Sequence, residues 1–154
     1  MHANARWYIA MVFIATAAVA LVGGALLATG VVRLAGPPDA WLWKYLIWIV
    51  GCAQLVAGGG CAWLSRKAPS FERVATTWSL LNLGSLGVIT GSLIGNFTLV
   101  SIGTASFDIA LVLFLAATRR ARYRYWSYSY RVVLVPVLVA SWVGVLFAAR
   151  IYPL

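Results

Sequence analysis

Hydrophobic residues run along the chain in long stretches that short polar segments interrupt. Continuous apolar runs cover residues 7–32, 41–64, 74–118 and 132–152. A transmembrane helix needs about 20 apolar residues, so the 45-residue run from 74 to 118 is long enough for two. Gly95 and Asn96 are the residues within it that suit a tight turn. The pattern therefore predicts five spans, at 7–32, 41–64, 74–95, 97–118 and 132–152.

Composition supports a membrane protein and excludes two other classes. The chain has 154 residues, of which 63% are hydrophobic and only 10% are charged. Soluble domains average about 45–50% apolar and about 25% charged residues. A soluble domain this small cannot hide so much apolar surface, and a disordered chain needs low hydrophobicity. We expect an all-α integral membrane protein, a five-transmembrane-helix bundle with one membrane domain over residues 1–154.

Basic residues are unevenly distributed between the two sides of the predicted bundle. The chain carries 12 Lys and Arg against 3 Asp and Glu. Five spans place nine of the basic residues on the side of the N-terminus and three, Arg33, Lys44 and Arg150, on the other. Because cytoplasmic loops carry the excess of Lys and Arg, we expect the N-terminus in the cytoplasm and the C-terminus outside. The expected location is a bacterial inner membrane.

The third predicted span carries a glycine stripe. Gly84, Gly87, Gly91 and Gly95 fall on one side of a helix, and the last three form a double GxxxG pattern. Helices associate inside lipid through close packing of small residues. Polar residues, including Asn82, fall on roughly the opposite side. We interpret the third span as the central helix, with the stripe serving either packing within the chain or a homodimer interface.

Asp108 is the one carboxylate inside a predicted span. A charge at the membrane centre costs at least about 2.5–3.5 kcal/mol on insertion scales. Ser101, Thr104 and Asp108 are spaced three and four residues apart, so they share a helix face that we expect to point into the bundle. Asp108 either binds a cation, a proton or a ligand, or is a protonated structural acid bonded to the third span, with Asn82 as a candidate partner.

The segment 119–131 is basic and aromatic. It contains no acidic residue, and on the cytoplasmic side it faces anionic lipid headgroups, which attract each basic residue by about 1 kcal/mol. A partner subunit is the alternative binding partner, and nucleic acid is not expected. The basic residues are Arg119, Arg120, Arg122, Arg124 and Arg131.

The sequence lacks the residues that several kinds of catalytic, cofactor or metal site require. The only histidine is His2, at the N-terminus, so no histidine inside the membrane is available to ligate haem or chlorophyll. Asp39, Glu72 and Asp108 lie at different predicted depths and do not form a two-carboxylate site. The sequence contains no metal-ligand cluster, P-loop or GxSxG motif. We therefore expect no metal, no certain cofactor and no enzymatic activity.

Several short motifs occur along the chain together with eight tryptophans and five predicted spans. The motifs are Pro37-Pro38 followed by Trp41, Asn82 in the third span, Asp108-Ile109-Ala110-Leu111, and Leu134-Val135-Pro136. In these features the chain resembles the TspO/MBR family of tryptophan-rich sensory and translocator proteins. The resemblance implies a five-helix bundle, often dimeric, that binds porphyrins or other apolar ligands under the first loop. Pro37, Pro38, Trp41 and Asn82 would then lie near the pocket.

Three functions follow as hypotheses. The first is binding or transport of an apolar small molecule. The site would combine polar residues of the third and fourth spans with the first loop, which contains Trp41. The second is an accessory subunit of a larger membrane complex, respiratory or photosynthetic, because the chain is small and lacks catalytic groups. The third is a proton- or ion-coupled carrier that depends on Asp108.

Membrane topology provides the first test. We expect a reporter fused to the N-terminus to be active in the cytoplasm and one fused to the C-terminus to be active outside, because five spans place the termini on opposite sides. Paired cytoplasmic and extracytoplasmic reporter fusions measure this directly. Two termini on the same side would contradict the five-span count.

Overall fold

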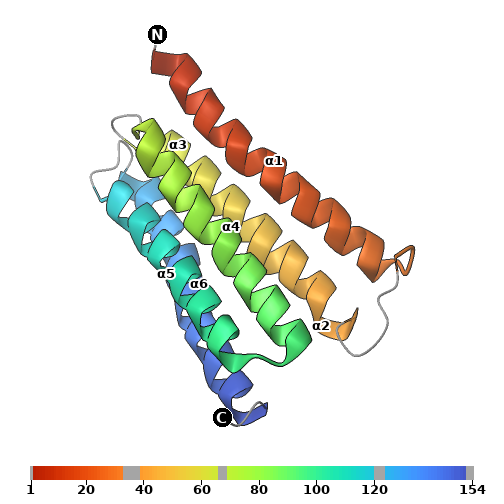
Figure 1. Cartoon of the computed structure of the whole chain (residues 1–154). Coiled ribbons are helices and arrows are strands. Elements are labelled where there is room, and N and C mark those ends of the chain that lie inside the picture. Colours follow the sequence, from red (N-terminus) through yellow and green to blue (C-terminus); the bar gives the residue numbers. More distant parts are fainter. Residues whose placement is uncertain (1, 33–38, 66–68, 120–123, 152–154) are drawn as a thin grey trace. The chain divides into compact units, whose positions relative to one another are not determined.

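The computed structural model describes residues 2–32, 39–65, 69–119 and 124–151, which are largely helical and contain no β-strand (Figure 1). Within these residues, five helices are long and apolar enough to cross a membrane. The fold class is therefore confirmed as all-helical with five candidate spans. These are Arg6–Ala28, Trp41–Leu64, Phe71–Ile94, Phe97–Ala117 and Tyr125–Val143.

The chain forms two compact units, Met1–Trp63 and Leu64–Leu154. Unit 1 contains the first candidate span and all but the last residue of the second, and unit 2 contains the other three. The first span is α1 (His2–Ala28), and the second joins α2 (Asp39–Lys44), η1 (Tyr45–Cys52), η2 (Leu55–Gly59) and α3 (Gly60–Leu64). Unit 2 contains α4 (Phe71–Ile94), α5 (Phe97–Ala117) and α6 (Arg124–Ile151).

In unit 1, α1 packs along a second span that is not a uniform α-helix. Its segments η1 and η2 are π-helical, a conformation that is rare and often marks functional sites. Each segment has a glycine that receives a large side chain of α1. A Cβ on Gly51 would lie 2.7 Å from Leu21 Cδ2, and a Cβ on Gly58 would overlap Phe13. The missing side chains thus provide the holes into which α1 packs.

The helix α1 ends at Ala28, although the hydrophobic pattern predicted a span that continues to residue 32. Gly30 has a positive φ of 71°, which glycine adopts without a Cβ penalty. The Gly30 amide donates to the Leu27 carbonyl at 3.1 Å, and the Val32 amide donates to the Leu26 carbonyl at 3.2 Å. A left-handed glycine therefore closes the helix while the sequence is still apolar.

In unit 2, α4 and α5 are joined by the tight turn that the sequence predicted at Gly95 and Asn96. Gly95 has a φ of 68° and ends α4, and the Asn96 side chain caps α5 by accepting from the Leu99 amide at 3.0 Å. Gly95 was expected to extend the glycine stripe, and this expectation is wrong. Its left-handed backbone places it outside the helix, where it serves the turn.

The remaining glycines of α4 lie against α5. A Cβ on Gly84 would lie 2.7 Å from the Gly103 carbonyl oxygen and 2.7 Å from the Phe107 amide nitrogen. A Cβ on Gly91 would lie 2.7 Å from the Val100 amide nitrogen. With Gly87, which faces the Cα of Gly103, they form a seam in which two backbones touch.

Within unit 2, the middle helix is the fourth span rather than the third. The helix α5 packs against both α4 and α6. It does so because Gly103 faces α4, while Asp108, on a different side of the same helix, reaches α6. The expectation that the third span is the central helix of the whole bundle stays a prediction.

The helix α6 begins at Arg124, so part of the basic aromatic segment is helical. The sequence predicted a loop up to Arg131 and a span at 132–152. Hydrophobicity marked where the apolar run starts, but no glycine or proline stops a helix between 124 and 131. Pro136, expected near the opening of the span, lies inside the helix. There it removes one backbone hydrogen bond.

Replacing Gly84 with alanine tests the α4–α5 seam. We expect Gly84→Ala to lower the free energy of unfolding by about 1–3 kcal/mol, because the methyl group meets backbone atoms that cannot rotate away. The control is Gly23→Ala in α1, where an added Cβ meets nothing within 4 Å. That control should be neutral or stabilising by up to about 1 kcal/mol. Thermal unfolding in detergent measures both, and equal stabilities would contradict the seam.

Candidate functional site

Asp108 lies buried in the middle of α5, with 7% of its surface exposed. Its Oδ1 lies 2.7 Å from the hydroxyl oxygen of Ser141, which comes from α6. Its Oδ2 is buried and has no hydrogen-bond partner. A buried carboxyl with one satisfied and one unsatisfied oxygen is unusual, because buried polar atoms are normally paired.

The two residues predicted to share the helix face of Asp108 make no hydrogen bond to α6, unlike Asp108. The Thr104 hydroxyl donates to the Val100 carbonyl at 2.9 Å, within its own helix. The Ser101 hydroxyl oxygen is buried without a hydrogen-bond partner. Seven residues separate Ser101 from Asp108, which corresponds to about 10 Å along a helix. These side chains share a helix face but do not converge on one point.

The predicted bond between Asp108 and Asn82 is wrong. The Asn82 side-chain amide donates to the Trp78 carbonyl at 2.8 Å, while the partner of Asp108 is Ser141. The reason lies in the rotation of α5, whose glycine side faces α4 and leaves Asp108 directed to α6. Sequence reasoning missed Ser141, although a serine in an otherwise apolar run is a visible signal.

Of the first-loop residues, only Trp41 lies within the described part of the chain. Its ring packs edge-on against Tyr45, with centroids 5.9 Å apart. Pro37 and Pro38 lie outside the described residues. The ligand site expected under this loop therefore stays a prediction.

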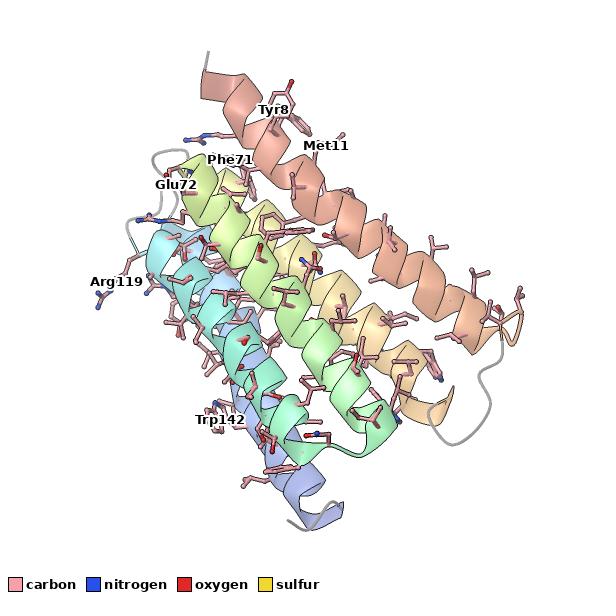
Figure 2. All side chains as sticks on the ribbon, viewed as in Figure 1. Tyr8, Met11, Phe71, Glu72, Arg119 and Trp142 are labelled. Carbon is pink, nitrogen blue, oxygen red and sulfur yellow. The ribbon has the colours of Figure 1, made fainter. Side chains whose placement is uncertain are left out.

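The basic segment is described only in part. Arg119 is exposed and extends away from the end of α5 (Figure 2), and Arg131 is half-buried on α6. Arg124 begins α6, and Arg120 and Arg122 lie outside the described residues. Contact of Arg119 with anionic headgroups is compatible with its exposure.

A groove opens in unit 1 where α1 runs along the end of the second span. It has a volume of about 360 Å³ and is lined by Arg6, Trp7, Ala10, Gly59, Ala62 and Trp63. Further along the same contact, Phe13 fills the space over Gly58. At the groove, small residues stand on both helices, so neither side fills the gap. An added Cβ on Gly59 would meet nothing within 4 Å.

None of the groove residues was among the predicted ligand-site residues. These residues come from two different spans, so the sequence does not show that they lie together. Only the alignment of α1 against the second span brings them to one place. The walls are mostly apolar, with the rings of Trp7 and Trp63 exposed and one guanidinium group, that of Arg6. Small-molecule sites commonly combine an apolar lining with a few polar groups.

A polar bridge crosses the same pair of helices. The Thr16 hydroxyl of α1 donates to the side-chain oxygen of Gln54, which lies between η1 and η2. Gln54 is fully buried. Buried amides need hydrogen-bond partners, so this bridge fixes which faces of α1 and the second span meet.

Comparisons with known proteins identify no relative: no protein-family model, no curated protein and no solved structure matches the chain. Among the described residues, no three His, Cys, Asp or Glu side chains stand close enough together to hold a metal ion.

Removing the Thr16 hydroxyl tests the polar bridge. We expect Thr16→Val to lower the free energy of unfolding by about 0.6–1.7 kcal/mol, the range measured for side-chain hydrogen bonds between membrane helices. Thr29→Val is the control, because the Thr29 hydroxyl, just after the end of α1, lies 2.9 and 3.2 Å from the carbonyls of Ala25 and Leu26 in the preceding turn rather than against the second span. Thermal unfolding in nanodiscs compares the two, and equal losses would contradict the bridge.

Proposed function

We propose that this protein is a multi-pass membrane protein that binds an apolar small molecule in the groove between α1 and the end of the second span. The observation that carries the proposal is the groove itself, of about 360 Å³, with Trp7 and Trp63 among its lining residues. This volume lies toward the lower end of the roughly 300–1,000 Å³ that is typical of small-molecule sites. Its size favours a flat or slender ligand.

The lining supports a particular ligand chemistry. Exposed tryptophan rings offer flat surfaces for stacking against a ring system, and the small residues Ala10, Gly59 and Ala62 leave room for it. Arg6 adds a guanidinium group that pairs with a carboxylate or another oxygen acceptor. A planar apolar molecule with acidic or carbonyl oxygens, such as a porphyrin or a quinone, meets both requirements.

The membrane placement is part of the same proposal. Five helices that are long and apolar enough to span support insertion, and the excess of basic residues on one side supports a cytoplasmic N-terminus in a bacterial inner membrane. In this orientation the groove opens near the cytoplasmic face, because Arg6 and Trp7 follow the N-terminus closely. Anionic lipids are the proposed partners of Arg119 and its basic neighbours.

Filling the groove tests the proposed function. The probes are protoporphyrin and a short-chain quinone, titrated into protein in nanodiscs while tryptophan fluorescence is recorded. We expect saturable quenching by the wild-type protein with at least one probe. Gly59→Leu should weaken binding at least about tenfold, which corresponds to about 1.4 kcal/mol, because the leucine occupies the groove.

The matched control is Gly23→Leu. Gly23 also faces open space, but it lies on α1 away from the groove, so this variant should bind like the wild type. Trp7→Phe and Trp63→Phe should each reduce the quenching amplitude. Quenching without saturation, or the same affinity in both glycine variants, would refute the groove as the ligand site.

A further inference from the structure

The buried carboxyl of unit 2 lies beside stretches of α4 and α6 that carry no opposite charge. Asp108 is the only ionisable residue of α5, and α4 carries none from Val74 to Ile94. On α6, the residues from 132 to 149 are also free of ionisable side chains. A carboxylate in such surroundings is costly unless a positive charge or several hydrogen-bond donors compensate it.

The nearest titratable groups on the neighbouring helices lie toward their ends. On α4 they are Glu72 and Arg73, eleven or more residues before Gly84, which faces α5 next to Phe107. On α6 they are Arg131 with the tyrosines that precede it, at least ten residues before Ser141, and Arg150, nine residues after Ser141. Nine helical residues correspond to about 13–14 Å, so each of these positions lies more than two helical turns from the residue that meets the carboxyl.

The Ser141 hydroxyl has two acceptors and one proton. Its oxygen lies 2.7 Å from Asp108 Oδ1 and 2.7 Å from the carbonyl oxygen of Leu138. A serine hydroxyl carries a single hydrogen, so it cannot make a short, straight hydrogen bond to both oxygens at once. If Asp108 is ionised, one of these two close oxygen pairs has no hydrogen between its atoms.

One additional proton satisfies both contacts. A neutral Asp108 donates from Oδ1 to the Ser141 oxygen, and Ser141 then donates to the Leu138 carbonyl. The other carboxyl oxygen, Oδ2, has no hydrogen-bond partner, and an unpartnered oxygen costs far less in a neutral acid than in a carboxylate. We propose that Asp108 is a proton-binding site, with its proton held in a relay from Asp108 through Ser141 to the Leu138 carbonyl.

Release of the proton follows from the same geometry. The Asp108 O–H bond breaks and the proton passes to a water molecule that enters from outside the helices. The Ser141 hydroxyl then rotates from the Leu138 carbonyl to the carboxylate. Loading and unloading of this site therefore depend on contact between α5 and α6. The site lies in unit 2, and the proposal does not rest on ligand binding in the groove of unit 1.

Infrared spectroscopy of the full chain in nanodiscs at neutral pH tests the proposal. We expect a protonated-carboxyl C=O band that disappears in Asp108→Asn, which retains the size of the side chain. The difference spectrum cancels the signals of all other carboxyl groups. Absence of this band, with carboxylate bands in its place, would show an ionised Asp108 and overturn the proposal. A dependence of those carboxylate bands on Na⁺ would identify a cation as the occupant instead.

A second variant tests the relay and stays informative if Asp108→Asn fails to fold. Ser141→Ala should shift the C=O band of Asp108 to higher frequency, because the acid loses its acceptor. Ser129→Ala is the control on the same helix, where the hydroxyl lies 3.5 Å from the Tyr125 carbonyl of α6, and it should leave the band in place. A band that does not move in Ser141→Ala would overturn the relay.

Discussion

Close backbone contact at glycine is the interaction on which the geometry of unit 2 depends. Where Gly84 meets Gly103, an added methyl group would approach backbone atoms at 2.7 Å. Close packing of small residues is the way helices associate where no hydrophobic force joins them, as inside lipid. The contact fixes the rotation of α5, because its glycine side must face α4. The acidic side of α5 is then directed to α6, where Ser141 lies within hydrogen-bonding distance. One steric requirement thus determines which helix receives the buried carboxyl.

Unit 1 uses the same packing principle and produces a different result. At two points of its contact, a large side chain of α1 enters the space over a glycine of the second span, as Phe13 does over Gly58, and at Gly24 of α1 the Ile47 side chain of the second span does the reverse. Near the N-terminus of α1, small residues face small residues, and the groove remains between them. The Thr16 to Gln54 bond holds the register that aligns the small residues. A groove that arises from packing in this way needs no loop to form it, and Arg6, Trp7 and Trp63 are among the residues that line it.

The features that depend on local chemistry could be predicted from the sequence. Those that depend on the orientation of each helix about its own axis could not. Hydropathy located the second span, Trp41–Leu64, with the bounds found in the structure, and small polar residues located the Gly95–Asn96 turn. Hydropathy failed at α6, because helix formation continues through arginine and tyrosine when no residue stops it. Asp108 was identified as an exceptional residue, but its partner was not, since the choice between Asn82 and Ser141 depends on the orientation of α5. The groove was missed because its residues are unremarkable on either helix alone.

The central claim is that the unit 1 groove holds an apolar ligand, and the molecules that accompany the protein out of its native membrane test this claim most directly. Wild-type protein and Gly59→Leu would be purified in mild detergent and analysed by mass spectrometry for bound small molecules and proteins. We predict that a specific apolar compound accompanies the wild-type protein and is depleted in the variant. An identical set of bound molecules in both preparations, or co-purification with other membrane subunits and no specific small molecule, would contradict the account.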